Sequence, residues 1–210
     1  MSKGFFIAFE GGDGSGKTTQ IKLLAKYLKD RKVPVHLTKE PGGCDMADKI
    51  RNLLVKGDVN SLDDLSEFLL FSAARHEHVR TTIKPMLDNG HSIITDRFYL
   101  SSYTYQSFAG GLDFEFVENI TKKAIMGCEP ELTFVLDINP IHGIARARER
   151  QLFQDELRME SKKLAYHEKI REGFLKAADT SDNIIVIDAE QSVEEIHAEV
   201  IKHLESRKLI

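Results

Sequence analysis

The chain has 210 residues, of which 41% are hydrophobic and 30% are charged. That is enough for one hydrophobic core without disulfides or metals. The formal net charge of -4 gives no overall positive field to attract DNA, RNA or an anionic membrane, so we expect no nucleic acid and no membrane as partners. The two cysteines, Cys44 and Cys128, are far apart, and no apolar run is long enough for a signal peptide or a membrane span. We therefore expect a cytoplasmic protein.

Short apolar runs alternate with helical patterns along the chain. The runs at 5–9, 33–38, 91–95, 132–136 and 184–187 predict five strands. In the segment 17–31, Ile21, Leu24 and Leu28 recur at helical spacing. Strands that are nearly continuous apolar runs and alternate with helices indicate one α/β domain over residues 1–210. We expect a doubly wound, five-stranded parallel sheet with helices on both faces.

A glycine-rich loop joins the first predicted strand to the first predicted helix. Its sequence, Gly11-Gly12-Asp13-Gly14-Ser15-Gly16-Lys17-Thr18, matches the pattern G-x-x-x-x-G-K-[ST]. The glycines let backbone N–H groups surround a phosphate, and the helix N-terminus adds a positive dipole end. Lys17 would reach the β- and γ-phosphates, and the Thr18 hydroxyl would ligate Mg²⁺. The loop predicts triphosphate binding but leaves kinases, GTPases, motors and switches open.

Polar residues follow the third predicted strand. Asp96 and Arg97 stand at its carboxyl end, where ligands bind in sheets of this kind, and Asp96 would join the Mg²⁺ shell. A surface ion pair is the structural alternative. In a helix that started at Arg97, Ser101 and Tyr105 would follow Arg97 at steps of four residues, and Ser102 and Gln106 would form a parallel row beside them. One helix face would then carry a guanidinium, hydroxyls and an amide.

The helix predicted before the third strand carries Phe71 and Arg75 four residues apart. A ring and a planar donor fork on one face suit a planar base, whereas a core phenylalanine and a solvated arginine are the alternatives. The helix is apolar around most of its circumference, so we expect cover on more than one side, with a second subunit as one candidate. His76 and His78 do not share a helix face, and we assign the histidines no chemistry.

A cluster of arginines precedes the last predicted helices. Arg146, Arg148, Arg150 and Arg158 flank residues 153–155, where a mobile flap would deliver positive charge to a transferring phosphoryl group. A solvated charged helix face is the alternative.

These segments together resemble bacterial thymidylate kinases. The matching stretches run in order through nearly the whole chain: Phe9 to Thr19, 39–43, Phe71 with Arg75, 83–85, 96–106, 130–133, 158–160 and 187–189. The resemblance implies a P-loop NTPase fold with a small lid at about 147–160. It also implies phosphoryl transfer from ATP to dTMP, giving dTDP and ADP, with Mg²⁺ as cofactor and a homodimer as the assembly.

The resemblance further assigns residues to each part of the site. The ATP-binding residues would be Gly11, Gly12, Asp13, Gly14, Ser15, Gly16, Lys17, Thr18, Thr19 and Arg146. The dTMP-binding residues would be Asp13, Glu40, Arg51, Phe71, Arg75, Arg97, Ser101, Ser102, Tyr105 and Gln106. The catalytic residues would be Asp13, Lys17, Arg97, Arg150 and Arg158, and Thr18 and Asp96 would hold the metal.

Particular roles follow for the acceptor site. Phe71 would stack on thymine, Arg75 would bond its carbonyl edge, and Tyr105 would crowd a ribose 2′-hydroxyl. Gly14 stands where one branch of the family has arginine, which implies that the lid supplies that charge. Another nucleoside monophosphate or deoxynucleoside kinase is the nearest alternative, and a P-loop switch is a more distant one. A GTPase is disfavoured because the chain has no Asn-Lys-x-Asp motif.

Overall fold

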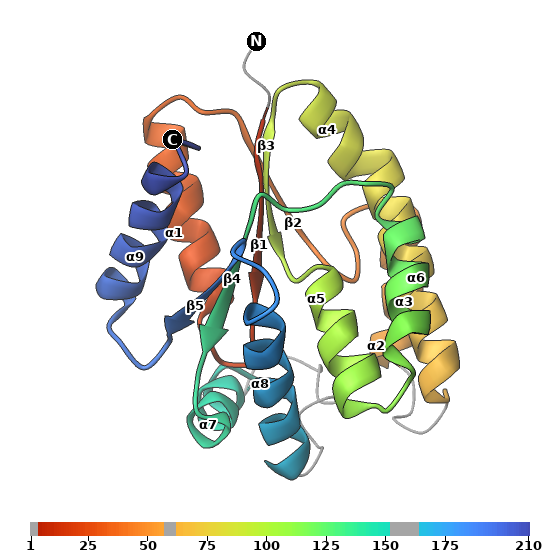
Figure 1. Ribbon diagram of the computed structural model, residues 1–210. Coiled ribbons are helices and arrows are strands. Elements are labelled where there is room, and N and C mark those ends of the chain that lie inside the picture. Colours follow the sequence, from red (N-terminus) through yellow and green to blue (C-terminus); the bar gives the residue numbers. More distant parts are fainter. Residues whose placement is uncertain (1–3, 57–61, 152–163) are drawn as a thin grey trace.

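The fold is built around a parallel sheet. The computed structural model describes residues 4–56, 62–151 and 164–210, and five strands in this part pair in the order β2-β3-β1-β4-β5 (Figure 1). The strands are β1 (Phe6–Glu10), β2 (Val35–Lys39), β3 (Ser92–Asp96), β4 (Leu132–Asp137) and β5 (Ile184–Asp188). All four pairings are parallel. The predicted sheet is confirmed, with strand bounds shifted by one or two residues.

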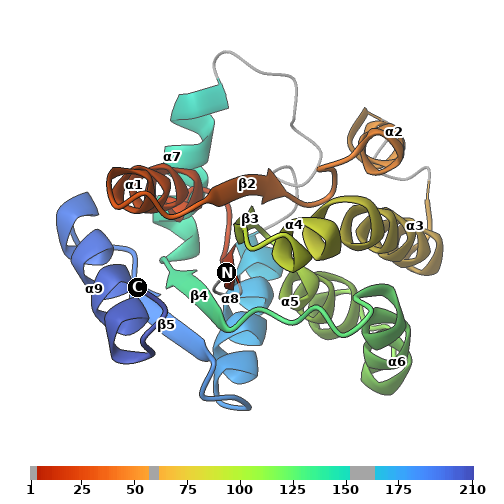
Figure 2. The ribbon, with the colours of Figure 1, turned by 90° about the horizontal axis from the view of Figure 1, so that it is seen from above.

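Helices cover both faces of the sheet. They are α1 (Lys17–Asp30), α2 (Asp45–Lys56), α3 (Asp64–His78), α4 (Lys84–Asp88), α5 (Tyr99–Ser102), α6 (Phe114–Ala124), α7 (Pro140–Gln151), α8 (Leu164–Ala178) and α9 (Val193–Ser206). Two π-helical segments, η1 (Val79–Ile83) and η2 (Tyr103–Ala109), continue α3 and α5. Helices α1 and α9 lie on one side of the sheet, and α3 to α6 lie on the other (Figure 2). The predicted doubly wound architecture is therefore correct.

The central strand β1 shows why its sequence is continuously apolar. Ile7 and Phe9 belong to a cluster that includes residues of α1 and α9. Phe6 and Ala8 point to the opposite face, where they pack with Val79 and other residues from the far side of the sheet. Successive side chains of a strand point to opposite faces, so a strand covered twice needs apolar residues at every position.

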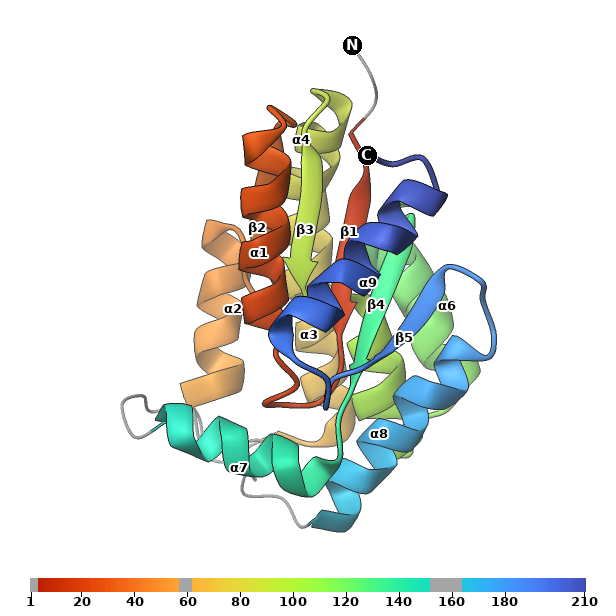
Figure 3. The same ribbon diagram turned by 90° about the vertical axis from the view of Figure 1, so that its left-hand side faces the viewer.

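The carboxyl ends of the strands gather the functional loops. Because the strands are parallel, the glycine-rich loop after β1 and the turn after β3 lie at one edge, and α7 lies below that edge (Figure 3). This edge is where ligands bind in doubly wound sheets. Among the described residues, no helix is long and apolar enough to cross a membrane.

Candidate active site

The glycine-rich loop forms a cradle at the start of α1. Gly16 precedes the helix with φ of 94°, a left-handed conformation that glycine adopts without steric cost. The Nζ atom of Lys17 donates to the carbonyl oxygens of Gly11 at 3.0 Å and Gly12 at 2.9 Å. Thr19 follows in the first turn of α1. The cradle therefore places several backbone N–H groups and one ammonium group at a helix N-terminus, which is an anion site.

A cavity of about 260 Å³ opens along this cradle. It is lined by Asp13, Gly14, Ser15, Gly16, Lys17, Thr18, Lys39, Glu40, Arg51, Asp96, Arg97 and Ala147. Arg51 reaches it from α2, where its Nη1 atom donates to the carbonyl of Pro41 at 2.9 Å. Residues predicted for the donor, the metal and the acceptor phosphate thus share one cavity.

The charge of Lys17 depends on its surroundings. Burial lowers the pKa of Lys17 to about 8, and the neighbouring guanidinium of Arg97 contributes in the same direction. The carboxylates of Asp96, Asp13 and Glu10 act against this shift. A phosphate placed beside the ammonium group would oppose the shift as well, because an adjacent negative charge favours the protonated amine.

Thr18 and Asp96 meet at the donor end of the cavity. The Thr18 hydroxyl donates to Oδ2 of Asp96 at 3.1 Å. Mg²⁺ prefers oxygen ligands and is usually held by one or two protein groups, waters and substrate phosphates. A hydroxyl and a carboxylate beside a phosphate cradle therefore fit Mg²⁺.

Arg97 joins the glycine-rich loop to the segment after β3. Its Nη2 atom lies 2.6 Å from Oδ1 of Asp13, and its Nη1 atom donates to the Gly11 carbonyl at 3.0 Å and to the Ser101 hydroxyl at 3.3 Å. The sequence interpretation considered the case of a helix that starts at Arg97. In the structure α5 starts at Tyr99 instead, and Arg97 has φ of 68°. Left-handed backbone is costly for arginine, and such strain is found where function fixes a residue.

The Asp13–Arg97 pair keeps its charges. Burial acts to raise the pKa of Asp13, but Arg97, Lys17 and His167 together hold it below its ordinary value. Burial likewise acts to lower the pKa of Arg97, while Tyr105 and Asp13 raise it above its ordinary value. The site therefore holds a carboxylate and a guanidinium in contact at neutral pH.

Arg75 is the centre of a buried network behind this pair. Its Nε atom donates to Oε2 of Glu40 at 2.7 Å, Nη1 to the Ser102 hydroxyl at 2.9 Å and Nη2 to the carbonyl of Phe98 at 3.2 Å. Only 3% of Arg75 is exposed, so the alternative of a solvated helix end is wrong. Because the Glu40 carboxylate accepts a hydrogen bond from Arg75, Glu40 orients the guanidinium that is predicted to bind the base.

His78 is a member of this network that the sequence interpretation missed. Its Nδ1 atom lies 3.0 Å from Oε1 of Glu40, and its Nε2 atom lies 2.7 Å from the Thr38 hydroxyl. The side chain is fully buried. The sequence interpretation assigned the histidines no chemistry and did not foresee the hydrogen bonds of His78. Its position three residues after Arg75, on the same helix face, was the signal that would have found it.

Glu10 is a second residue that the sequence interpretation missed. It accepts hydrogen bonds from the backbone N–H groups of Phe98 at 2.8 Å and Ser101 at 3.1 Å, and from the Ser101 hydroxyl at 2.6 Å. Burial raises the pKa of Glu10 in spite of these bonds and of Arg97. Glu10 thus fixes the start of α5 from the end of β1.

The remaining residues predicted for the acceptor lie around Arg97 and Arg75. The Tyr105 ring lies 5.3 Å from the Arg97 guanidinium, and the Gln106 amide donates to Glu67 at 3.2 Å. Phe71 is half-buried on α3, one turn before Arg75, and so it is not a fully buried core residue. The residues predicted to bind the base, the sugar and the phosphate of the acceptor therefore lie near one another, beside the glycine-rich loop.

The structure describes only the first residues of the predicted lid segment, 147–160, together with Arg146 just before it. Arg146 on α7 donates from Nη1 to the Ala189 carbonyl at 3.0 Å and lies 3.6 Å from Glu190. Residues 152–163, which include Arg158, lie outside the described residues, and so does the side chain of Arg150.

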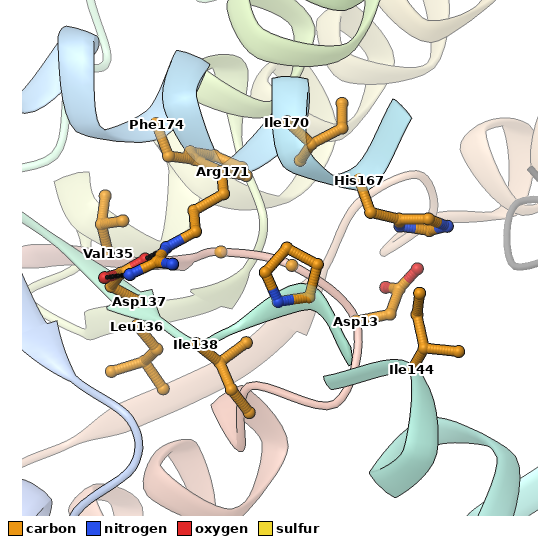
Figure 4. Close-up of a pocket in the computed structure, with 13 residues that line it drawn as sticks. Asp13, Val135, Leu136, Asp137, Ile138, Ile144, His167, Ile170, Arg171 and Phe174 are labelled. Carbon is orange, nitrogen blue, oxygen red and sulfur yellow. Dashed lines mark hydrogen bonds and ion pairs between the residues drawn. The ribbon is translucent and has the colours of Figure 1, made fainter. Parts of the chain in front are cut away.

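A water-sized cavity of about 20 Å³ lies behind the loop (Figure 4). Arg171 of α8 makes a bidentate pair with Asp137 there, with N–O distances of 2.7 and 2.8 Å. Figure 4 shows the imidazole of His167 beside the Asp13 carboxylate. Helix α8 and the glycine-rich loop therefore line this cavity together.

The family model and the curated relatives that match this chain belong to the same family. The thymidylate kinase family model matches residues 9–200. Curated thymidylate kinases from Syntrophotalea carbinolica and Magnetococcus marinus are 42% and 40% identical over 196 and 206 residues. These alignments cover 91% of both chains in the first case, and 98% of this chain and 97% of the relative in the second.

The solved structures agree with the sequence relatives. The crystal structure of thymidylate kinase from Ehrlichia chaffeensis matches with a TM-score of 0.78 at 33% identity, covering 97% of this chain and 100% of that one. With the family model matching most of its length, the chain belongs to the thymidylate kinase family.

Proposed function

We propose that this protein transfers the γ-phosphoryl group of ATP to dTMP, giving dTDP and ADP. The observation that carries the proposal is the Arg97–Asp13 contact of 2.6 Å, which links the triphosphate cradle to a second polar site. A nucleotide switch needs the first site alone, whereas a kinase needs a second site for the acceptor. Family membership supports dTMP as that acceptor.

The residues that recognise the thymine base are Arg75, Phe71, Ser102 and Gln106. A guanidinium has five N–H donors, and contacts within the described part of the chain use three of those of Arg75. Two donors are left for the carbonyl edge of thymine. Phe71, one turn away on α3, stacks on the ring, and Ser102 and Gln106 complete the polar contacts.

The acceptor phosphate and sugar lie next to the cradle. Arg51 and Arg97 line its cavity and bind the phosphate. Asp13 orients the sugar and the phosphate, with Ser101 supporting Arg97 from the start of α5. Tyr105, packed against Arg97, fills the space beside the sugar C2′ and disfavours a ribose.

Transfer itself depends on position and charge. Phosphoryl transfer needs little covalent help from the protein, so aligning the two anions and neutralising the transferring group supply most of the acceleration. Lys17 and Arg97 both line the cavity and donate to the same carbonyl oxygen of Gly11, so their positive charges lie close together beside the transferring group. Thr18 and Asp96 would hold Mg²⁺, which neutralises charge on the β- and γ-phosphate oxygens when bound.

The lid remains a proposal from the sequence. We assign residues 147–160 to it, with Arg150 and Arg158 as the arginines that reach the transferring group, because Gly14 leaves the loop without one. Arg146 would face the adenine from the base of α7, next to Ala189.

A homodimer is the proposed assembly. Leu65 and Leu69 lie four apart on α3 and are 43% and 45% exposed, and Leu53 on α2 is 63% exposed. Large exposed apolar side chains on adjacent helices are typical of a subunit interface. Neither Cys44 nor Cys128 forms a disulfide among the described residues, which suits the reducing cytoplasm that we propose as the location.

ADP release from ATP tests the acceptor. The enzyme is supplied with dTMP, dUMP, dGMP, CMP and AMP in separate reactions, and kcat/KM is measured for each. The proposal requires a clear preference for dTMP. Equal rates with several acceptors, or faster turnover of another one, would reject dTMP as the substrate and favour a different nucleoside monophosphate kinase.

A further inference from the structure

Two glycines make a backbone contact between the glycine-rich loop and α7. A Cβ atom added to Gly14 would overlap the carbonyl of Gly143, and one added to Gly143 would lie 2.6 Å from the carbonyl oxygen of Asp13. The first clash is with backbone rather than with a side chain that can rotate away. The tip of the loop therefore rests directly on the backbone of α7.

Gly143 is an unfavourable residue for its own helix. It lies buried in the first turn of α7, where its N–H group donates to the Asn139 carbonyl at 2.9 Å. Glycine in a helix is less stable than alanine because it loses more conformational freedom on folding. Local helix stability therefore argues for alanine at this position, and the contact with Asp13 supplies a reason for glycine.

The contact reaches the reacting groups through Asp13. The backbone of Asp13 touches Gly143, and its carboxylate lies 2.6 Å from Arg97. We propose that Gly143 is a positioning residue for phosphoryl transfer, which seats Asp13 against Arg97 by letting α7 approach the loop. This inference rests on the proposed kinase function.

The same contact explains Gly14. Its φ of 73° disfavours any other residue, and the Gly143 carbonyl occupies the space that a side chain would enter. With α7 in this place, position 14 cannot carry an arginine. The positive charge found there in one branch of the family must then come from another part of this chain.

Substitution of Gly143 by alanine separates the effect of this residue on the stability of α7 from its effect on the placement of Asp13. An ordinary contact begins at about 3.4 Å, so a Cβ at 2.6 Å forces α7 and Asp13 apart by about 0.8 Å. A misplacement of about 1 Å can cost about 100-fold in rate. We expect kcat to fall by roughly 10- to 100-fold, with KM for ATP changed less than about threefold. The midpoint of urea unfolding should fall only modestly, because the preference of the helix for alanine offsets part of the cost of moving the two backbone segments apart.

Ala145→Gly is the matched control. Ala145 is exposed on the same helix, so this substitution should lower the unfolding midpoint slightly and leave kcat unchanged. Gly143→Ala with a kcat within twofold of wild type would overturn the proposal. A Gly143→Ala chain that fails to fold would also overturn it, since the contact would then belong to folding rather than to the placement of Asp13.

The assay keeps this inference separate from the proposed substrate. Both variants are compared with wild type using whichever acceptor the wild type turns over fastest. A wild-type enzyme that does not prefer dTMP refutes the substrate assignment, whereas an unaffected Gly143→Ala variant refutes only the positioning role.

Discussion

Arg75→Ala removes the centre of the buried network and should damage both stability and acceptor binding. The substitution deletes three hydrogen bonds. It leaves Glu40, whose side chain is 4% exposed, with His78 as its ionisable partner among the described residues. Breaking a buried ion pair from one side costs about 3–5 kcal/mol, because the remaining charge loses its compensation. That is a large part of the roughly 5–15 kcal/mol that stabilises a typical domain.

Urea unfolding measures the loss. With a slope of about 2 kcal/mol per M, the midpoint should fall by about 2 M. Arg80→Ala is the matched control, since Arg80 is 53% exposed and pairs with Glu77 on the same surface, and its midpoint should stay at the wild-type value. Glu40→Gln combined with Arg75→Ala should be less destabilising than the sum of the single changes by about 1–3 kcal/mol.

Kinetics supply the second half of this prediction. Under folding conditions Arg75→Ala should raise KM for dTMP at least tenfold and leave KM for ATP nearly unchanged, because Arg75 lies behind the acceptor side of the site. A loss of less than about 1 kcal/mol in stability would refute the claim that the pair is buried and coupled. Equal increases in both KM values would refute the acceptor role.

Three further predictions concern the cradle, the metal and the assembly. The pKa of Lys17 is about 8 in the folded chain, against an ordinary lysine value of 10.5, so the unfolded chain binds more protons between these values and stability should rise with pH across that window. The unfolding free energy of wild type, relative to that of Lys17→Met, should rise by about 1–2 kcal/mol from pH 7.5 to 9.5; a flat difference contradicts the shifted pKa. Asp96→Asn should raise the Mg²⁺ concentration for half-maximal activity about tenfold or more, and an unchanged requirement would remove Asp96 from the metal site. In analytical ultracentrifugation, Leu69→Glu should convert a dimer into a monomer while Ile141→Glu, at an exposed position on α7, should not; a dimeric Leu69→Glu chain would place the interface elsewhere.

The sequence predicts those parts of the site that local patterns determine. A continuous apolar run such as 5–9 identifies a strand buried on both faces. Asp96 and Arg97 stand directly after a second such run, the predicted strand 91–95. Parallel strands end at one edge, so residues distant in sequence, such as Thr18 and Asp96, were expected to meet there. Their hydrogen bond confirms this.

The parts that could not be predicted depend on contacts between distant segments. Glu40 meets Arg75 and His78 across 35 and 38 residues, and only the packing of α3 against the end of β2 brings them together. A helix from Arg97 does not form because the backbone N–H of Arg97 donates to the Phe9 carbonyl and that of Phe98 donates to Glu10, so α5 starts at Tyr99. The wide turns of η2 then change which residues after Ser102 share a face.

Transfer of the γ-phosphoryl group tests the central claim most directly. The enzyme is given Mg²⁺, dTMP and ATP labelled at the γ-phosphate, and the products are separated. The paired site predicts that the label appears in dTDP, in amounts equal to the ADP formed. Label that appears only as inorganic phosphate, whether or not dTMP is present, would contradict a kinase and identify a nucleotide-hydrolysing switch instead.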